Sequence, residues 1–128
     1  MTNKEATRHA SDTQEKRVAG KLGGKVSSNS GAGMFNKGDI VCEDASLLIE
    51  CKTCMEPKKS FSIKKEWIEK NKEEAFRLRL DNHIIAFNFD YQDKSDYYII
   101  DDKLMSYLVD KLEEDNSSWV DEFRKKLP

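Results

Sequence analysis

The stretch GDIVCEDASLLIECK, residues 38–52, decides the fold because it sets Asp39, Glu50 and Lys52 beside strongly apolar residues. Two strand-like runs, 39–43 and 47–53, are separated by a short connection, which predicts an antiparallel hairpin. With the turn centred between Asp44 and Ala45, the numbers of opposed residues add up to 89, whether the loop has two residues or four. The predicted pairs are Asp39 with Glu50, Ile40 with Ile49, Val41 with Leu48 and Cys42 with Leu47.

This register divides the hairpin into two faces, because side chains alternate along a strand. One face is apolar and consists of Ile40, Cys42, Leu47, Ile49 and Cys51. The charged face carries Asp39, Glu50 and Lys52 beside Val41 and Leu48. Directly opposed Cβ atoms lie about 4.5–5.5 Å apart, so the carboxylates of Asp39 and Glu50 would repel each other. A cation is required there, either the Lys52 amine or a divalent metal ion.

A bound metal ion would make the charged face a candidate catalytic site. Mg²⁺ is held by one or two carboxylates and takes phosphate oxygens as further ligands. Asp39, Glu50 and the backbone carbonyl of Cys51 are the candidate ligands, and Glu15 approaches as a further acid from the helix before the hairpin. Such a site hydrolyses phosphodiesters, with Lys52 orienting or deprotonating the water or stabilising the developing charge. The alternative is a surface cluster of ion pairs without catalytic function.

The length of 128 residues predicts one domain, with residues 1–10 as a loose tail and 11–128 as the folded unit. The chain lacks a run of 18 or more apolar residues, and its start, MTNKEATRHA, is too polar for a secretory signal. We therefore expect a soluble, cytoplasmic protein with no membrane partner. Three cysteines, an odd number without repeated spacing, favour a reducing compartment over a disulfide framework.

The charges are unevenly distributed along the chain. Residues 1–38 hold seven Lys or Arg against three Asp or Glu, residues 39–80 hold nine of each, and residues 81–128 hold six against twelve. A basic front can steer a polyanion to one face although the net charge is −2. The candidate phosphate-binding residues are Lys16, Arg17, Lys21, Lys25 and Lys37. A solvated basic helix face is the alternative.

The remaining elements are predicted from periodicity and from start and stop signals. A helix over 11–22 begins with a capping-box pair, Ser11 and Gln14, and stops at Gly23. A helix within 60–82 has Ser62 as its cap. The further elements are an extended piece near 25–28, strands over 83–89 and 96–100, and helices over 102–115 and 117–127. The aromatic residues Phe61, Trp67, Phe87 and Phe89 are interpreted as core or dimer-interface residues.

These residues resemble the PD-(D/E)xK nuclease superfamily and, within it, the small Holliday junction resolvases of archaea and phages. The motif is present as Gly38-Asp39 and as Glu50 to Lys52, Glu15 matches the helical acid, and Ser30 matches the loop serine. Gly38 stands where the name of the superfamily has Pro, and the loop over 30–39 is longer than the archaeal pattern.

The resemblance implies an α/β fold with a restriction-endonuclease-like core, in which helices flank a central mixed five-stranded sheet in the order αβββαββ. It also implies a homodimer that depends on Mg²⁺ or Mn²⁺ and makes paired symmetric nicks in four-way DNA junctions, in the host cytoplasm for a phage member. Ser30 would then contact DNA together with the lysines. Two alternatives stay open: a restriction-like or repair nuclease acting on linear or flapped duplex, and a non-catalytic DNA-binding protein.

Overall fold

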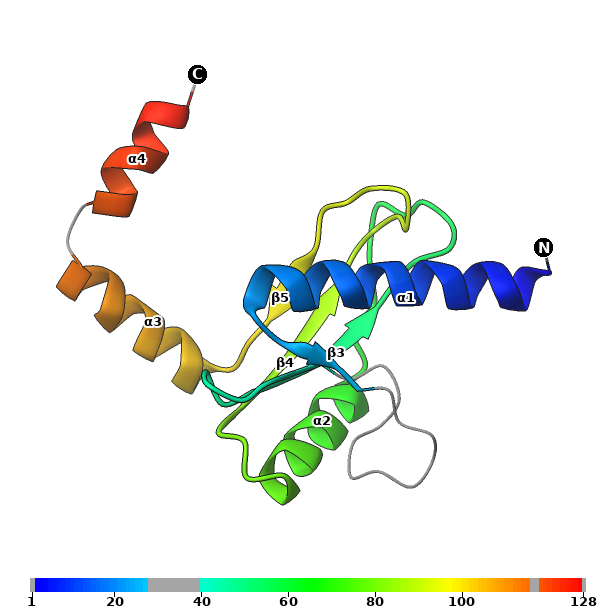
Figure 1. Ribbon diagram of the computed structural model, residues 1–128, viewed down its shortest axis with the longest axis horizontal. Helices are drawn as coiled ribbons and strands as arrows, with labels where there is room; N and C mark the ends of the chain where they lie inside the picture. Colours follow the sequence, from blue (N-terminus) through cyan, green and yellow to red (C-terminus); the bar gives the residue numbers. More distant parts are fainter. Residues whose placement is uncertain (1, 28–39, 116–117, 128) are drawn as a thin grey trace.

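The computed structural model describes residues 2–27, 40–115 and 118–127. These residues form a five-stranded sheet in the order β1-β2-β3-β4-β5. Only the β3–β4 pair is parallel, and α2 makes the crossover between these two strands. The elements, in chain order, are α1 (Asn3–Leu22), β1 (Lys25–Val26), β2 (Ile40–Cys42), β3 (Leu47–Lys52), α2 (Lys65–Arg77), β4 (Asn82–Phe87), β5 (Tyr97–Ile99), α3 (Asp102–Asp115) and α4 (Ser118–Lys126) (Figure 1). The predicted α/β class, with a mixed sheet flanked by helices, is confirmed.

The β2–β3 hairpin has the predicted register. The paired residues are Ile40 with Ile49, Val41 with Leu48, and Cys42 with Leu47. A slip of one residue would have moved every side chain to the opposite face, so this agreement also fixes which residues point to which side. The expected pair of Asp39 with Glu50 lies outside the described residues, because Asp39 is not among them.

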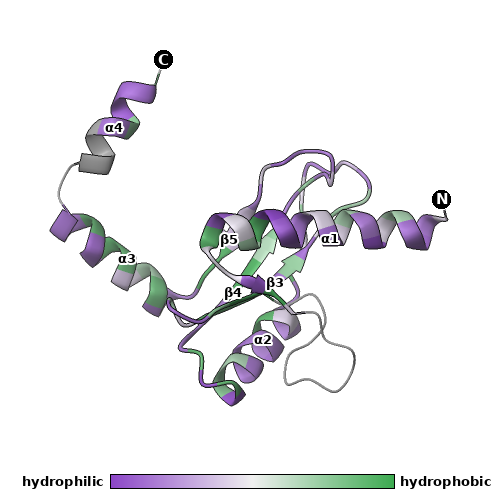
Figure 2. Cartoon of the chain, in the orientation of Figure 1, coloured by the Kyte–Doolittle hydropathy of each residue, from purple (hydrophilic) through white to green (hydrophobic). Residues whose placement is uncertain are grey.

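Each face of the sheet is covered by a different helix. On the α1 side, the buried cluster is Val18, Ala19, Ile40, Cys42, Ile49, Ile84, Ala86 and Leu104, with Leu47 and Cys51 packed against it. On the α2 side, Val41, Leu48 and Ala75 are buried together. Figure 2 shows the apolar colour on the central strands between two largely hydrophilic helices. The predicted division of the hairpin is therefore confirmed for residues 40–52, and Glu50 and Lys52 belong to the α2 side.

Helix α1 begins earlier than the sequence pattern predicts. Thr2 is its N-cap: the Glu5 backbone N–H donates to Thr2 Oγ1 at 3.1 Å, and the Thr2 backbone N–H donates to Glu5 Oε2 at 3.1 Å. The predictions of a loose tail over 1–10 and of a helix start at Ser11 are wrong, because this capping box satisfies the first turn at Thr2. The predicted end is confirmed, since Gly23 adopts a left-handed conformation with φ of 71°.

Helix α2 also differs at its start. It begins at Lys65, and its N-cap residue, Lys64, makes no side-chain cap hydrogen bond, so the predicted cap at Ser62 is wrong. The preceding segment is fixed by the rest of the fold instead, since the Lys58 backbone N–H donates to the carbonyl of Phe89 at 2.9 Å. This contact holds the segment that leads into the helix.

Helix α3 points away from the sheet (Figure 1), and the hydropathy colours show apolar residues along it (Figure 2). Leu104 is buried in the core, while Leu108 and Leu112, one and two turns further on, are 41% and 44% exposed. Among the described residues, no helix is both long and apolar enough to span a membrane.

Candidate functional site

Glu50 and Lys52 meet at the end of β3 on the α2 side of the sheet. The Nζ atom of Lys52 lies 3.4 Å from Oε1 of Glu50. The Glu50 side chain is 32% exposed and the Lys52 side chain is 28% exposed, so each is about two thirds withdrawn from solvent. An ion pair in this setting is screened less than one on the open surface. The predicted proximity of the acid and the amine is confirmed.

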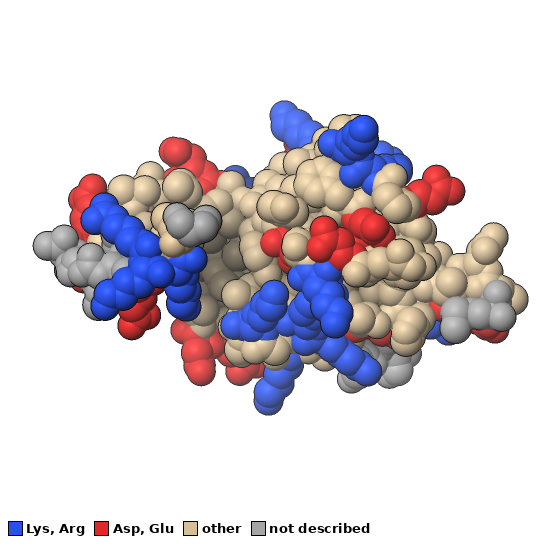
Figure 3. Space-filling model, turned by 90° about the horizontal axis from the view of Figure 1, so that it is seen from above, with Lys and Arg blue, Asp and Glu red and all other residues tan. Residues whose placement is uncertain are grey.

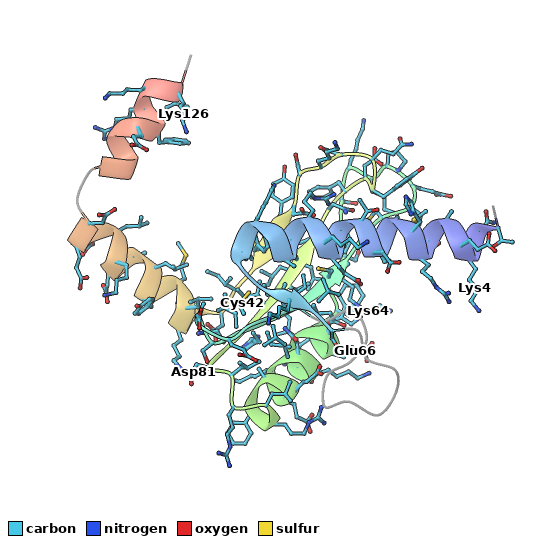
Figure 4. All side chains as sticks on the ribbon, viewed as in Figure 1. Lys4, Cys42, Lys64, Glu66, Asp81 and Lys126 are labelled. Carbon is cyan, nitrogen blue, oxygen red and sulfur yellow. The ribbon has the colours of Figure 1, made fainter. Side chains whose placement is uncertain are left out.

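The Lys52 amine also contacts the ring of Trp67. Nζ of Lys52 lies 4.4 Å from the centroid of the Trp67 ring, within the range of a cation–π interaction. Nζ of Lys64 lies 5.8 Å from the same centroid. Lys64 and Glu66 mark the beginning of α2 in Figure 4, and Trp67 follows them in the first turn. The start of α2 therefore restricts where the Lys52 amine can lie.

The backbone at the end of β3 is held by α1. The side-chain amide of Gln14 donates to the backbone carbonyl of Lys52 at 2.9 Å and to Oδ1 of Asp96 at 3.3 Å. Gln14 is only 1% exposed, so these hydrogen bonds are buried and hold the Lys52 carbonyl and the Asp96 carboxylate in place. Gln14 thus connects α1, β3 and the segment before β5.

Arg17 completes this buried connection rather than facing solvent. Its Nε and one terminal nitrogen donate to the two carboxyl oxygens of Asp96 at 2.7 and 2.9 Å. The Asp96 side chain is 1% exposed, and its hydrogen bond raises the pKa of the Arg17 guanidinium, with a further rise from its charge and an opposing effect of burial. Arg17 was a candidate for binding DNA phosphates. Asp96 accepts from two of the five N–H donors of the guanidinium, so Arg17 has a structural contact, and its role in binding phosphate stays a prediction.

Glu15 and Asp39 are the other acids expected at the site. Glu15 follows Gln14 in α1 and is half-buried, with a contact of its own. Within 2–27, 40–115 and 118–127, no three His, Cys, Asp or Glu side chains gather as a metal-binding group. Asp39 is outside those ranges, so the complete predicted set of Asp39, Glu50, Glu15 and the Cys51 carbonyl stays a prediction.

The expected phosphate-binding residues are only partly described. Lys16, Lys21 and Lys25 are exposed, as a contact to DNA would require. Ser30 and Lys37 lie outside the described residues. Seen from above, Lys and Arg side chains form separate groups over the body and over the C-terminal helix (Figure 3). In this view the basic residues do not make one continuous surface.

The three cysteines are interpreted as structural residues that pack in or beside the core. Among the described residues, Cys42, Cys51 and Cys54 form no disulfide bond, and Cys42 and Cys54 are buried. Burial raises the pKa of the Cys42 thiol, so it stays protonated at neutral pH, and burial also raises the pKa of the Tyr98 hydroxyl. The Cys51 side chain packs on the α1 side, away from Glu50 and Lys52, as predicted.

Three residues of the site were not found from the sequence: Gln14, Asp96 and, in its contact with the amine, Trp67. Gln14 was assigned to a helix cap, and Asp96 is 82 residues away from it, so no local pattern connects the two. Trp67 carried a usable signal, because an aromatic residue in the first turn of α2 lies near the end of the preceding strand in a βαβ unit.

Comparison with known proteins adds no family to this description. No protein-family model, no curated protein and no solved structure matches the chain.

Proposed function

We propose that this chain is a metal-dependent DNA endonuclease of the PD-(D/E)xK type that cuts branched DNA and resolves four-way junctions by paired nicks as a homodimer. One observation carries the proposal: Glu50 and Lys52 lie on one face of β3 with the Lys52 amine 3.4 Å from the Glu50 carboxylate. The β2–β3 register on which the predicted Asp39–Glu50 pair depends is also the observed one.

The oxygen donors of the proposed site suit a hard divalent cation such as Mg²⁺ or Mn²⁺. Glu50 and Asp39 would hold the ion with the backbone carbonyl of Cys51, and Glu15 would assist. When bound, such an ion polarises the scissile phosphate and lowers the pKa of a coordinated water. The surroundings of Glu50 fit this role, because its carboxylate is partly withdrawn from water beside an amine that balances its charge.

Lys52 has the second role in the proposal. Its amine would orient the attacking water and stabilise the negative charge that develops on the phosphate oxygens. Such a group acts best when it is fixed before the substrate arrives. The contacts of Lys52 support this: Trp67 restricts its amine, Glu50 pairs with it, and Gln14 holds its backbone carbonyl.

A surface ion pair without function would need none of these restraints. Exposed pairs are worth about 0–1 kcal/mol, and their long side chains stay mobile. Here an aromatic ring and a carboxylate both contact the Lys52 amine, and a buried amide donates to the backbone carbonyl of the same residue. This difference favours catalysis over the two non-catalytic interpretations, the surface cluster and the DNA-binding protein without activity.

The proposal is tested by the substitution Glu50→Gln. We expect it to lower Mg²⁺-dependent cleavage of a four-way junction by about 100-fold or more, because a neutral amide is a weak ligand for a divalent cation. DNA binding should persist or tighten, since a negative charge near phosphate is lost. Cleavage is measured by gel assay with and without EDTA, and binding by fluorescence anisotropy.

Glu43→Gln is the matched control, because Glu43 is an exposed carboxylate in the turn of the same hairpin. It should cleave like the wild type. Native cleavage by the Glu50→Gln variant, or equal losses in the two variants, would contradict the assignment of Glu50. Linear duplex of the same sequence, run in parallel, separates the junction resolvase from a nuclease of linear DNA, which would cut both substrates equally.

A further inference from the structure

A groove adjoins Lys52 on the α2 side of the sheet and lies outside the proposed metal ligands. Its volume is about 630 Å³. It extends from the end of β3 over the segment that follows to the first turn of α2. The lining residues that matter below are Lys52, Lys58, Ser60, Phe61, Ser62 and Trp67. The groove therefore begins at the amine that we place in the reaction.

The walls of the groove are fixed by contacts with the end of β4 and with the β4–β5 connection. The Lys58 backbone N–H donates to the carbonyl of Phe89 at 2.9 Å, and the Cys54 backbone N–H donates to Oδ1 of the buried Asn88 at 2.9 Å. The ring of Phe61 stacks on that of Phe87, with centroids 4.8 Å apart. These contacts hold the segment without help from a ligand, so the groove exists before binding. A preformed site avoids the entropic cost of ordering a loop.

The charge and chemistry of the groove suit a phosphodiester backbone. Lys52 and Lys58 line it, and Nζ of Lys64 lies 5.8 Å from the centroid of the Trp67 ring, whereas Glu56 is its one acidic lining residue among the described ones. Residues 56–65 hold four lysines and one glutamate. The Ser60 and Ser62 hydroxyls add donors of the kind that bind phosphate oxygens.

We propose that this groove binds the sugar–phosphate backbone of the DNA strand as it leaves the cleavage site, with Lys58 and Lys64 contacting phosphates. The inference rests on the proposed function, because that function makes DNA the ligand. It moves the main phosphate contacts from α1, where Arg17 pairs with Asp96, to the opposite side of the sheet. Trp67 would then contact both the Lys52 amine and the bound DNA strand.

The double substitution Lys58→Ala with Lys64→Ala tests the groove. We expect it to weaken binding to a four-way junction roughly tenfold and to make the log–log salt dependence of the affinity shallower by about two, one for each lost phosphate contact. Binding is measured by fluorescence anisotropy in EDTA at several salt concentrations. No cleavage occurs under these conditions, so the result does not depend on catalysis.

Lys65→Ala with Lys72→Ala is the control, because it removes the same charge from α2. Lys65 pairs with Glu69 and its side chain is 89% exposed, Lys72 is exposed as well, and neither lines the groove. This variant should keep the wild-type affinity within about twofold and the wild-type salt slope. Unchanged thermal unfolding of both variants separates binding from folding.

The outcomes distinguish the two proposals. Equal affinities of the two double variants would overturn the groove assignment, and a wild-type protein that cleaves the junction in Mg²⁺ would then leave the proposed function standing. If the wild type neither binds nor cleaves DNA, both proposals are wrong. A selective loss of affinity in the Lys58 and Lys64 variant supports the groove even if Glu50→Gln leaves cleavage unchanged.

Discussion

At the scale of single residues, the Arg17–Asp96 pair shows the largest difference between a residue's expected and observed surroundings. Asp96 has a carboxyl group that is 1% exposed, and Arg17 meets it through two hydrogen bonds. Removing one partner of a buried pair leaves the other without compensation, which costs far more than losing a surface pair. Arg17 should therefore act on stability before it acts on DNA.

Substitution of Arg17 by Met is expected to lower the free energy of unfolding by about 2–3 kcal/mol, because buried Asp96 loses its charged hydrogen-bond donors. The midpoint of urea unfolding, followed by circular dichroism, measures this change. Lys16→Met is the control: Lys16 is exposed on the same helix, and its substitution should change stability by less than about 0.5 kcal/mol. Equal effects of the two variants would show that the pair does not stabilise the fold.

The sequence predicted the charged hairpin residues better than their supports. Glu50 and Lys52 share a face because strand side chains alternate, and this rule needs no knowledge of the rest of the chain. Gln14, Arg17 and Asp96 meet only after the sheet has brought distant segments together, so their roles could not be read from local spacing. Ser11 and Gln14 matched a capping box by spacing alone, while Thr2 and Glu5 form the real one.

At the scale of secondary-structure elements, two glycines near the end of α1 have opposite surroundings. A Cβ atom on Gly24 would lie 2.6 Å from Sγ of Cys42 and 2.6 Å from Cγ2 of Ile40, whereas a Cβ on Gly20 would meet nothing within 4 Å. Gly24 thus lets the chain pass closely over β2 as it turns from α1 into β1. Gly20 lies in the helix, where its flexibility only adds entropy to the unfolded chain.

Gly24→Ala is expected to destabilise the protein by about 1–3 kcal/mol, because two core side chains must move to admit the methyl group. Gly20→Ala should stabilise it by about 0.5–1 kcal/mol through helix propensity. Thermal unfolding of both variants gives the signs directly. A stabilising Gly24→Ala substitution would mean that the turn between α1 and β1 does not approach β2 as closely as described.

Element boundaries were predicted correctly where the signal for them is local. The hairpin register and the end of α1 at Gly23 were predicted correctly, because alternation and a left-handed glycine are local signals. The start of α2 was not, because Ser62 suggested a cap by residue type alone, whereas the observed N-cap residue, Lys64, makes no side-chain cap hydrogen bond. The sequence showed that a helix forms there but not where it begins.

At the scale of the whole molecule, the proposed paired nicks require two active sites, and one chain carries one. We expect light scattering to give a mass of about twice the 14.8 kDa chain. Mixing wild-type protein with excess Glu50→Gln protein should then yield junctions nicked on one strand, because each mixed dimer has one active site. A mixture with Glu43→Gln should still give paired nicks. A monomeric mass with and without junction DNA would refute the homodimer.

The pair of Arg17 with Asp96 also has a consequence for biosynthesis, because 79 residues separate its members. At the usual rate of translation, about 5–20 residues per second, Asp96 is made roughly 4–16 s after Arg17. Throughout that interval the nascent first helix has no carboxylate to receive its guanidinium, and a polypeptide released earlier would never acquire one. The Arg17–Asp96 pair can therefore form only after the strand residues that pack against α1, such as Ile40 and Ile49, have been synthesised.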